Sequence, residues 1–561
     1  MRRSARALTR PVPALLLVTA AGLLARLWAL GWRVAHQDEG RVASWILHYM
    51  QTGRWEYRAI IHGPFLPHVE GVLFSVLGPS DFTMRLAVAV VGGLLPLVAL
   101  LFRSRLRDVE VIGAGLFLAA NPVLLYYSRF MRNDVLLAAF ALAAVGFAVR
   151  AVDTGDPRYT YGVAVAYALA LTTKENALVY LIAWAGALVL VADHRVLRAR
   201  AAGEAPVAAV WGTVRPPLRT LWSWRRHLLG AVVAGAAVVV AFYAPLPDLY
   251  VALTHPTRLP GVVDAATVGT VDKFSRTWAS HGLRDHPYLP FLGHFVDVQW
   301  RAALPVSVFA VVGFLVTRYG DGPPRPLVAF AFYWGAASVV GYPLIIDISA
   351  AWSNVHAIVP LAVPAAVGLG LVVDAARSAL DSGDRVAVGA AAVLLVAPAA
   401  LTAGVAYDTT YRAPQSPDNP LVQYAQPSGE MQSELATIRR VSREHAGGPD
   451  VLFYGHEFYS ANETWAAGED PPSGWFARLP LPWYLDSYGA EVTSTTDAET
   501  LARMDDAEKP PVVVALGAGA NVDQTAADVA PQLEGYDRTE RQGYLHGRPV
   551  VFFVRSGAAG E

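Results

Sequence analysis

The sequence predicts an α-helical polytopic membrane protein with about eleven transmembrane helices and a C-terminal α/β domain outside the membrane. Of its 561 residues, 54% are hydrophobic and only 16% are charged, which is unusual for a soluble enzyme. Apolar stretches close to the length that crosses ~30 Å of hydrocarbon recur through the first 406 residues. The chain then becomes polar and acidic. We therefore expect a membrane domain over residues 1–406 and a second domain over residues 407–561.

The apolar stretches are spaced so that short connections alternate with a few long ones. They lie at about residues 12–30, 83–102, 109–127, 134–150, 158–173, 177–192, 228–247, 302–317, 326–346, 354–373 and 386–406. The gap between the first two stretches predicts a long first outer loop over residues 31–82.

The distribution of arginine predicts the orientation, because short cytoplasmic loops collect basic residues. With the N terminus in the cytoplasm, the cytoplasmic segments hold Arg2, Arg3, Arg6 and Arg10, then Arg103, Arg105 and Arg107, then Arg150 and Arg158, then Arg195, Arg198, Arg200, Arg215, Arg219, Arg225 and Arg226. An odd number of spans places the C-terminal domain outside. The first stretch is expected to stay uncleaved, since no clear small-residue cleavage site follows it.

The C-terminal domain has the composition of a small acidic α/β domain. Residues 407–561 contain 23 acidic and 11 basic side chains. Short β-prone runs occupy residues 451–454, 512–516 and 550–554, and residues 433–445 and 523–533 have helical composition. The chain has no cysteine, which excludes a disulfide framework, a thiolate nucleophile and a cysteine metal site.

An acidic pair in the segment His36-Gln37-Asp38-Glu39-Gly40 follows the first predicted span. One interpretation is structural, with Asp38 as the N-cap of a helix over about residues 39–51. The other is catalytic: one carboxylate acts as general base on an acceptor hydroxyl, which is a weak nucleophile without a nearby proton acceptor. The spacing alone favours neither interpretation.

Two arginines lie in the segment 126–134, on the expected outer side, where the positive-inside bias disfavours them. Arg129 and Arg132 could snorkel to lipid headgroups with Asp134 as their partner. However, the arginine fork suits a phosphate, and ionisable groups at the edge of a membrane bundle usually face a cavity. We predict that both arginines bind phosphate and that Asp134 orients an arginine or reaches the reacting centre.

Lys174 lies in the segment Thr172-Thr173-Lys174-Glu175-Asn176, at the expected outer end of the fifth span, and is one of only three lysines. A surface pair with Glu175 is the alternative, although adjacent residues do not face each other on a helix. We predict that Lys174 binds phosphate as a compact charge, with Glu175 in a supporting role.

We single out three of the histidines that lie on the expected outer side. We expect His62 to bind a phosphate or the acceptor and His68 to be structural, whereas His356 is a helix-end residue or a supporting one. None belongs to an HExxH motif or another strong metal pattern. We therefore predict no required cofactor, although a divalent metal bridging carboxylate and phosphate is compatible with the sequence.

In this order, the motifs resemble the GT-C membrane glycosyltransferases, in particular the protein O-mannosyltransferase and aminoarabinose-transferase superfamily. Within it they are most similar to an archaeal family described as flippase-activity-associated proteins of N-glycosylation. The motifs that carry the resemblance are Asp38-Glu39, His62-Gly63-Pro64, Ser80-Asp81-Phe82-Thr83-Met84-Arg85-Leu86, the segment 126–134 and Thr173-Lys174-Glu175-Asn176.

The resemblance implies a polyprenyl (dolichyl) phosphate carrying one sugar as donor, a cavity open to the membrane and the outside, and inversion at the anomeric carbon. Asp38 matches the acidic residue that is the family's presumed base, and Glu39 is its neighbour. His62 takes the place of a histidine or lysine that precedes two prolines, although Gly63 replaces the first proline. Arg129, Arg132 and Lys174 fall where donor-phosphate contacts are expected. A departure occurs at residues 346–355, where Trp352 is present but the family's lysine is not.

Together these features predict a membrane glycosyltransferase that transfers a sugar from the lipid-linked donor to an acceptor at the outer membrane face, with Asp38 as general base. The acceptor class, whether glycan, lipid or protein, stays open, and no nucleic-acid partner is expected. The main alternative is a non-catalytic protein that assists flipping of lipid-linked sugars. Against it, the predicted spans are nearly free of ionisable groups apart from Arg26. A second alternative is a scaffolding subunit whose C-terminal domain binds a surface partner.

Overall fold

The computed structural model of the protein describes residues 11–59, 62–203, 205, 219–280, 286–423, 425–464, 471–506, 508–520, 522–543 and 547–557. The basic residues Arg2, Arg3, Arg6, Arg10 and Arg215 lie outside these ranges, and the side chains of Arg195 and Arg198 are not among those described.

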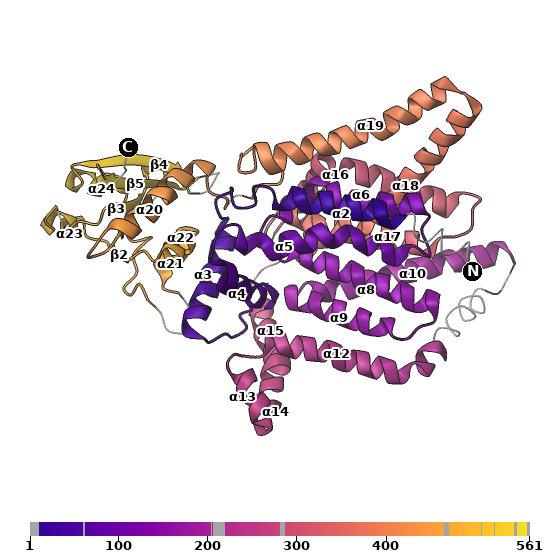
Figure 1. Ribbon diagram of the computed structural model, residues 1–561, viewed down its shortest axis with the longest axis horizontal. Helices are drawn as coiled ribbons and strands as arrows, with labels where there is room; N and C mark the ends of the chain where they lie inside the picture. The colour runs from indigo at the N-terminus through magenta and orange to yellow at the C-terminus, as the bar shows by residue number, and fades with distance from the viewer. Residues whose placement is uncertain are drawn as a thin grey trace.

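The membrane region is a bundle of helices that run side by side (Figure 1). They are α2 (Pro11–Leu27), α5 (Thr83–Leu94) with η1 (Leu95–Phe102), α6 (Asp108–Ala120), α7 (Pro122–Tyr127), α8 (Asp134–Thr154), α9 (Tyr159–Thr173), α10 (Ala177–Ala201), α12 (Arg225–Tyr243), α16 (Tyr288–Tyr319), α17 (Pro326–Ile345), α18 (Val355–Ser382) and α19 (Arg385–Tyr407). Each predicted apolar stretch coincides with helix. Within the described ranges, seven helices are long and apolar enough to cross a bilayer, and three shorter apolar helices accompany them. The prediction of a multi-pass helical membrane protein is confirmed.

The bundle is built around α18, which is the most buried of the long apolar helices. Gly313 of α16 and Gly368 of α18 let these helices approach closely, because a Cβ on Gly313 would lie 2.1 Å from the carbonyl oxygen of Pro364. The predicted third stretch is broken between α6 and α7. There the Asn121 side chain accepts from the backbone N–H groups of Val123 and Leu124, so that it caps α7.

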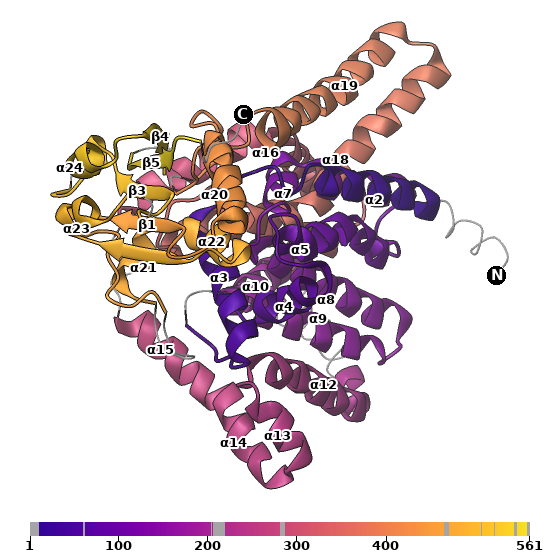
Figure 2. The ribbon, with the colours of Figure 1, turned by 60° about the vertical axis from the view of Figure 1, so that its left-hand side comes forward.

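Several shorter helices gather at one end of the bundle. The first long loop forms α3 (Gln37–Thr52) and α4 (Phe65–Leu77), and η4 (Ala351–Asn354) precedes α18. The chain after α12 forms α13 (Asp248–Thr254), η2 (Pro256–Arg258), α14 (Leu259–Asp264), η3 (Ala265–Gly269) and α15 (Thr270–Ser280), which extend along one side of this end (Figure 2). We call it the domain-side end, because the C-terminal domain packs there. At the opposite end, Arg105 and Arg107, in the connection between η1 and α6, form ion pairs with Asp153 of α8 and Asp374 of α18.

The C-terminal domain contains a five-stranded sheet in the order β2-β1-β3-β5-β4, in which β1 pairs in parallel with β2 and β3, and β5 pairs antiparallel with β3 and β4. Its elements are η5 (Asp408–Arg412), η6 (Gly429–Met431), α20 (Gln432–Glu444), β1 (Val451–Tyr454), α21 (Ser473–Ala477), α22 (Leu481–Tyr488), β2 (Val492–Thr495), α23 (Ala498–Arg503), β3 (Val512–Leu516), η7 (Ala518–Ala520), α24 (Ala526–Val529), η8 (Ala530–Gln532), β4 (Tyr536–Gln542) and β5 (Pro549–Arg555). The predicted α/β class and three strands are confirmed. Strands β2 and β4 were not predicted.

The C-terminal domain fixes the position of α3. Gly40 of α3 packs so tightly on Pro480 that a Cβ would lie 2.7 Å from the Pro480 Cβ. Next to this contact, Trp483 Nε1 and Tyr484 Oη each donate to Asp81 at 2.9 Å. The start of α3 is therefore held between the bundle and the domain.

Candidate functional site

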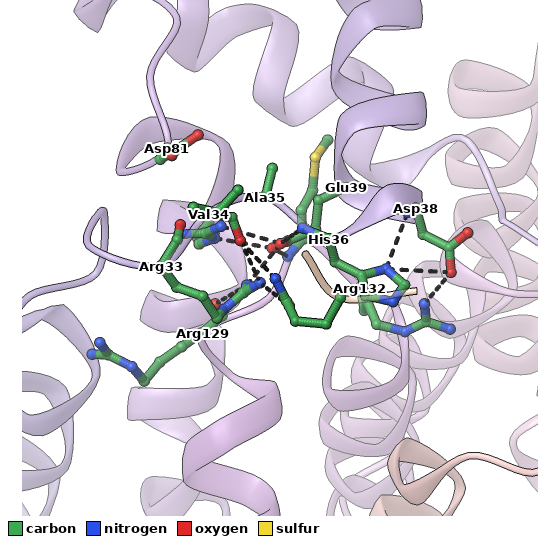
Figure 3. A network of polar contacts seen from close by, with 12 residues as sticks. Arg33, Val34, Ala35, His36, Asp38, Glu39, Asp81, Arg129 and Arg132 are labelled. Carbon is green, nitrogen blue, oxygen red and sulfur yellow. Dashed lines mark hydrogen bonds and ion pairs between the residues drawn. The ribbon is translucent and has the colours of Figure 1, made fainter. Parts of the chain in front are cut away.

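Asp38 lies in the first turn of α3, and its carboxylate faces cations from two directions. The N-cap of α3 is His36, whose Nδ1 accepts from the Asp38 backbone N–H at 3.0 Å, so Asp38 is not the cap. Arg132 Nη1 donates to Asp38 Oδ2 at 2.6 Å (Figure 3). Arg41 Nη2 lies 3.3 Å from Asp38 Oδ1. Burial alone raises the pKa of Asp38, but Arg132 and Arg41 outweigh it and hold this pKa well below its ordinary value. Asp38 is therefore an ionised carboxylate that keeps 23% of its side chain exposed.

Glu39 has a different environment, although it is the next residue. Its side chain is completely buried and forms ion pairs with Arg33 at 2.7 Å and Arg85 at 2.9 Å. The backbone N–H groups of His36 and Met131 also donate to its oxygens. All of its acceptor positions face inward, so Glu39 fastens α3 to the bundle, whereas Asp38 is the member of the pair that is open to a ligand.

Arg132 connects Asp38 to a second carboxylate deeper in the bundle. Its guanidinium carbon lies 3.6 Å from the centre of the Trp352 ring, and its Nε lies 3.5 Å from Asp134 Oδ2. The Nε forms no hydrogen bond within the described residues. Stacking on Trp352 holds the guanidinium plane while leaving donor capacity, which suits a planar fork that binds a phosphate.

Asp134 gathers groups from three parts of the chain at the domain-side end. Lys174 Nζ, which follows α9, donates to Asp134 Oδ1 at 2.8 Å. His356 Nε2, in the first turn of α18, lies 3.1 Å from the same oxygen, and its Nδ1 lies 2.6 Å from Tyr180 Oη. The structure thus brings the predicted residues Asp134, Lys174 and His356 together, and Asp134 Oδ2 accepts no hydrogen bond within the described residues.

His62 lies beside this group because its loop packs tightly on the end of α9. The Gly63 N–H donates to the Thr173 carbonyl at 2.8 Å, and a Cβ on Gly63 would lie 2.2 Å from the Thr172 carbonyl oxygen. Burial, followed by the nearby Arg132 charge, lowers the pKa of His62 to about 3. His62 is therefore neutral at physiological pH and can donate or accept one hydrogen bond, but it does not act as a cation.

Two other predicted residues lie apart from the Asp38 and Asp134 carboxylates. Glu175 points to the first loop, where Tyr57 Oη donates to its carboxylate, and burial raises the pKa of Glu175. Arg129 extends away from Asp38 (Figure 3) and donates to the carbonyls of Ala25, Arg26, Trp28 and Ala29 at the end of α2. An arginine is favourable at that negative helix end, so Arg129 has a local structural partner.

A cleft of about 460 Å³ opens next to His62, between α3, the first loop and α15. Trp45, Trp55 and Tyr57 line it together with the cationic residues Arg54, Arg58, Lys273 and Arg276. It offers an aromatic floor and a basic rim beside the Asp38 site. Among the described residues no group of three or more histidine or acidic side chains is arranged to hold a metal ion, and the absence of a cofactor requirement stays a prediction.

The comparisons with known proteins agree with this architecture. Residues 61–215 match the family model described as dolichyl-phosphate-mannose-protein mannosyltransferase, and residues 431–555 match the Agl23 flippase-associated protein C-terminal domain. A crystal structure of ArnT from Cupriavidus metallidurans bound to undecaprenyl phosphate superposes with a TM-score of 0.54 at 16% identity, over 96% of this chain and 97% of that one. The protein has a GT-C membrane glycosyltransferase-like fold.

A second solved structure supports the same GT-C assignment. The archaeal oligosaccharyltransferase AglB from Archaeoglobus fulgidus, in complex with an inhibitory peptide and a dolichol-phosphate, gives a TM-score of 0.51 at 13% identity, over 95% of this chain and 73% of that one. No curated protein sequence matches the chain. The fold is therefore that of the GT-C enzymes, joined to an Agl23-type C-terminal domain.

Some residues that build the site were not predicted from the sequence. Arg33 and Arg85 hold Glu39, Arg41 flanks Asp38, and Gln423 contacts His36 from the connection between the domains. Arg85 lies within one of the motifs that carry the GT-C resemblance, and an arginine in an otherwise apolar stretch was the available signal. Nothing in the sequence indicates Gln423, because its contact joins residues 387 positions apart.

Proposed function

We propose that the protein transfers a sugar from a polyprenyl phosphate to an acceptor hydroxyl, with inversion, at the domain-side end of the bundle. The observation that carries the proposal is the Asp38–Arg132–Asp134–Lys174 chain, in which two carboxylates alternate with two cations beside an open cleft. Such a chain can exchange one internal ion pair for a phosphate while keeping a carboxylate at the reacting centre.

Arg132 and Lys174 are the proposed phosphate-binding pair. Both already lie within ion-pair distance of Asp134, so a phosphate that reaches them neutralises charge without requiring either side chain to leave the cavity. Attraction between these charges is strong because the site is partly dehydrated. The similar structures of ArnT bound to undecaprenyl phosphate and of AglB in complex with a dolichol-phosphate support this ligand class.

Asp38 is the proposed general base. In the ligand-free site Arg132 keeps its pKa low, which makes it a weak base. A donor phosphate bound to Arg132 neutralises that charge and so raises the pKa of Asp38 when substrate is present. Asp38 then takes the acceptor proton while the acceptor oxygen bonds to the anomeric carbon. The anomeric carbon–oxygen bond to phosphate breaks, and the phosphate leaves with the electron pair, stabilised by Arg132 and Lys174.

We infer that the domain-side end faces the outside of the cell. The arginines at the opposite end, including Arg105 and Arg107, follow the cytoplasmic side of the positive-inside rule. In this orientation Asp38, His62, Arg132 and Lys174 all face the outer surface, where a flipped lipid-linked sugar is accessible.

The proposal is tested by deleting the gene and complementing with the parental protein or with Asp38→Asn. We expect the deletion strain to accumulate a monosaccharide-linked polyprenyl phosphate, and only the parental protein to clear it. Asp408→Asn is the matched control, because Asp408 is an exposed carboxylate paired with Arg412. If Asp38→Asn clears the lipid as fast as the parental protein, Asp38 is not the base.

The Agl23-type C-terminal domain also favours a second function, in which the protein assists flipping of lipid-linked sugars without catalysis. In that case deletion removes outward-facing donor rather than accumulating it, and Asp38→Asn restores it. Accessibility of the donor to an impermeant reagent added outside sealed cells separates the two functions.

A further inference from the structure

A separate cleft of about 350 Å³ lies where the C-terminal domain meets the bundle. Gly31 and the loop of residues 79–82 form one wall, and residues of α22 together with Arg439 and Arg443 of α20 form the other. The acid in this cleft, Asp81, already accepts from Trp483 and Tyr484. The groups that remain open to a ligand are therefore the two arginines.

Arg439 and Arg443 have no carboxylate partner in the described part of an acidic domain. They lie one turn apart on α20, and both are exposed. Seven of the other nine lysines and arginines of the domain form ion pairs with acids, namely Arg412, Arg478, Arg503, Lys509, Arg538, Arg541 and Arg548. Arg555 donates instead to the Tyr536 hydroxyl and the Lys509 carbonyl. Arg439 instead lies over the Tyr488 ring, 5.7 Å from its centre. The cleft thus has two positive charges that no described carboxylate compensates.

Exposed aromatic side chains place this cleft at the level of the lipid headgroups. Trp28, Trp32 and Phe82 are 69%, 72% and 40% exposed next to the end of α2, and Phe82 lines the cleft. Large aromatic residues exposed at the end of a membrane helix are typical of the membrane–water interface. Gln432, at the start of α20, donates to the Trp32 carbonyl, so α20 is fixed at this level.

We propose that this cleft binds the phosphate headgroup of an anionic membrane lipid on the domain-side leaflet. Arg439 and Arg443 hold the phosphate oxygens, and the acyl chains extend past Phe82 along the bundle. The bound lipid links α20 to the loop of residues 79–82, which is the same loop that anchors α22 through Asp81. This inference does not depend on the proposed transferase activity.

The test is a lipid titration of the full-length protein in detergent, followed by native mass spectrometry. The probes are phosphatidylglycerol, phosphatidylcholine and inorganic phosphate. For Arg439→Gln/Arg443→Gln we expect phosphatidylglycerol binding about tenfold or more weaker, since each arginine near a membrane surface contributes roughly a fivefold effect. Arg439→Lys/Arg443→Lys keeps the charge and should retain most of the affinity. Arg503→Gln/Arg538→Gln removes two exposed charges elsewhere in the domain and should change the affinity less than about twofold.

Three results would overturn the proposal. The first is unchanged phosphatidylglycerol affinity in the double glutamine variant, and the second is an equal loss in the Arg503/Arg538 control. The third is that millimolar inorganic phosphate displaces phosphatidylglycerol and that the protein binds phosphatidylglycerol no more tightly than phosphatidylcholine. This result would assign the cleft to a soluble anion. If the double variant fails to fold, as judged by gel filtration, the single variants Arg439→Gln and Arg443→Gln decide the outcome, with about a fivefold loss expected for each.

Discussion

The buried Glu39 cluster gives the sharpest stability prediction, for the substitution Glu39→Gln. Glu39 accepts from two arginines and two backbone N–H groups and has no exposed surface. A glutamine fits the same space but removes the buried carboxylate that Arg33 and Arg85 share. Breaking a buried ion pair of this kind costs about 3–5 kcal/mol.

That cost converts into a measurable shift in thermal unfolding. For a cooperative unit of 150–250 residues, 3–5 kcal/mol corresponds to a midpoint lower by roughly 6–20 °C. The assay is thermal unfolding of the detergent-purified protein, followed by tryptophan fluorescence, with Asp408→Asn as the matched control. Asp408 is exposed and pairs with an exposed arginine, so its substitution should leave the midpoint within about 2 °C of the parental value.

The sign of the pH dependence follows from the pKa of Glu39. Burial raises this pKa, but Arg33 and Arg85 outweigh burial and hold it well below its ordinary value. The stabilisation is therefore complete above the unfolded-state pKa of about 4.3 and is lost only as pH falls towards the folded pKa. The difference between parental protein and Glu39→Gln should be constant from about pH 6 to pH 8. A Glu39→Gln protein as stable as the parental one would refute the structural role that we assign to Glu39.

Three further predictions concern the site and its supports. Arg132→Lys removes the stacking on Trp352, so the KM for the lipid-linked donor should rise roughly 5- to 30-fold with a smaller change in kcat. An unchanged KM would contradict the role of the stacked guanidinium. Gly63→Ala should lower the unfolding midpoint by several degrees, because the added Cβ collides with the Thr172 carbonyl. Gly53→Ala is the control: no atom lies within 4 Å of its added Cβ, so this variant measures only the cost of a positive φ. His62 has a folded pKa of about 3, below its unfolded value of about 6.5, so the unfolded state takes up the proton first and stability falls as pH drops from about 6.5. The unfolding midpoint of His62→Gln should therefore fall less between pH 7 and pH 5 than that of the parental protein. An equal fall in both proteins would mean that another group takes up this proton.

The sequence predicts the membrane region well because the solvent imposes a simple pattern. Each predicted apolar stretch is helical, since a spanning segment must satisfy its own backbone hydrogen bonds. The weaker predictions concern the C-terminal domain. Strand β4 reads YDRTERQ and has mostly exposed polar side chains, and β2 is four half-buried residues, so neither has the apolar run that identifies a strand.

The candidate site shows a different limit. Arg129 and Arg132 have the same residue type and share a loop, yet one caps α2 and the other meets Asp38. Spacing within an irregular segment does not determine which way each side chain points. The meeting of Asp134 with Lys174 and His356 depends on helix packing across as many as 222 positions, which periodicity alone cannot provide.

The most direct test of the transferase proposal is a single-turnover reaction with purified protein. The donor is the lipid-linked monosaccharide from membranes of the deletion strain, and the readout is free polyprenyl phosphate released as sugar appears on an acceptor from the same membranes. We expect the parental protein to release one polyprenyl phosphate per sugar transferred, and Asp38→Asn to react about 10²- to 10⁴-fold more slowly while binding the donor with unchanged affinity. Release at the parental rate by Asp38→Asn, or no release by the parental protein, would contradict the proposal.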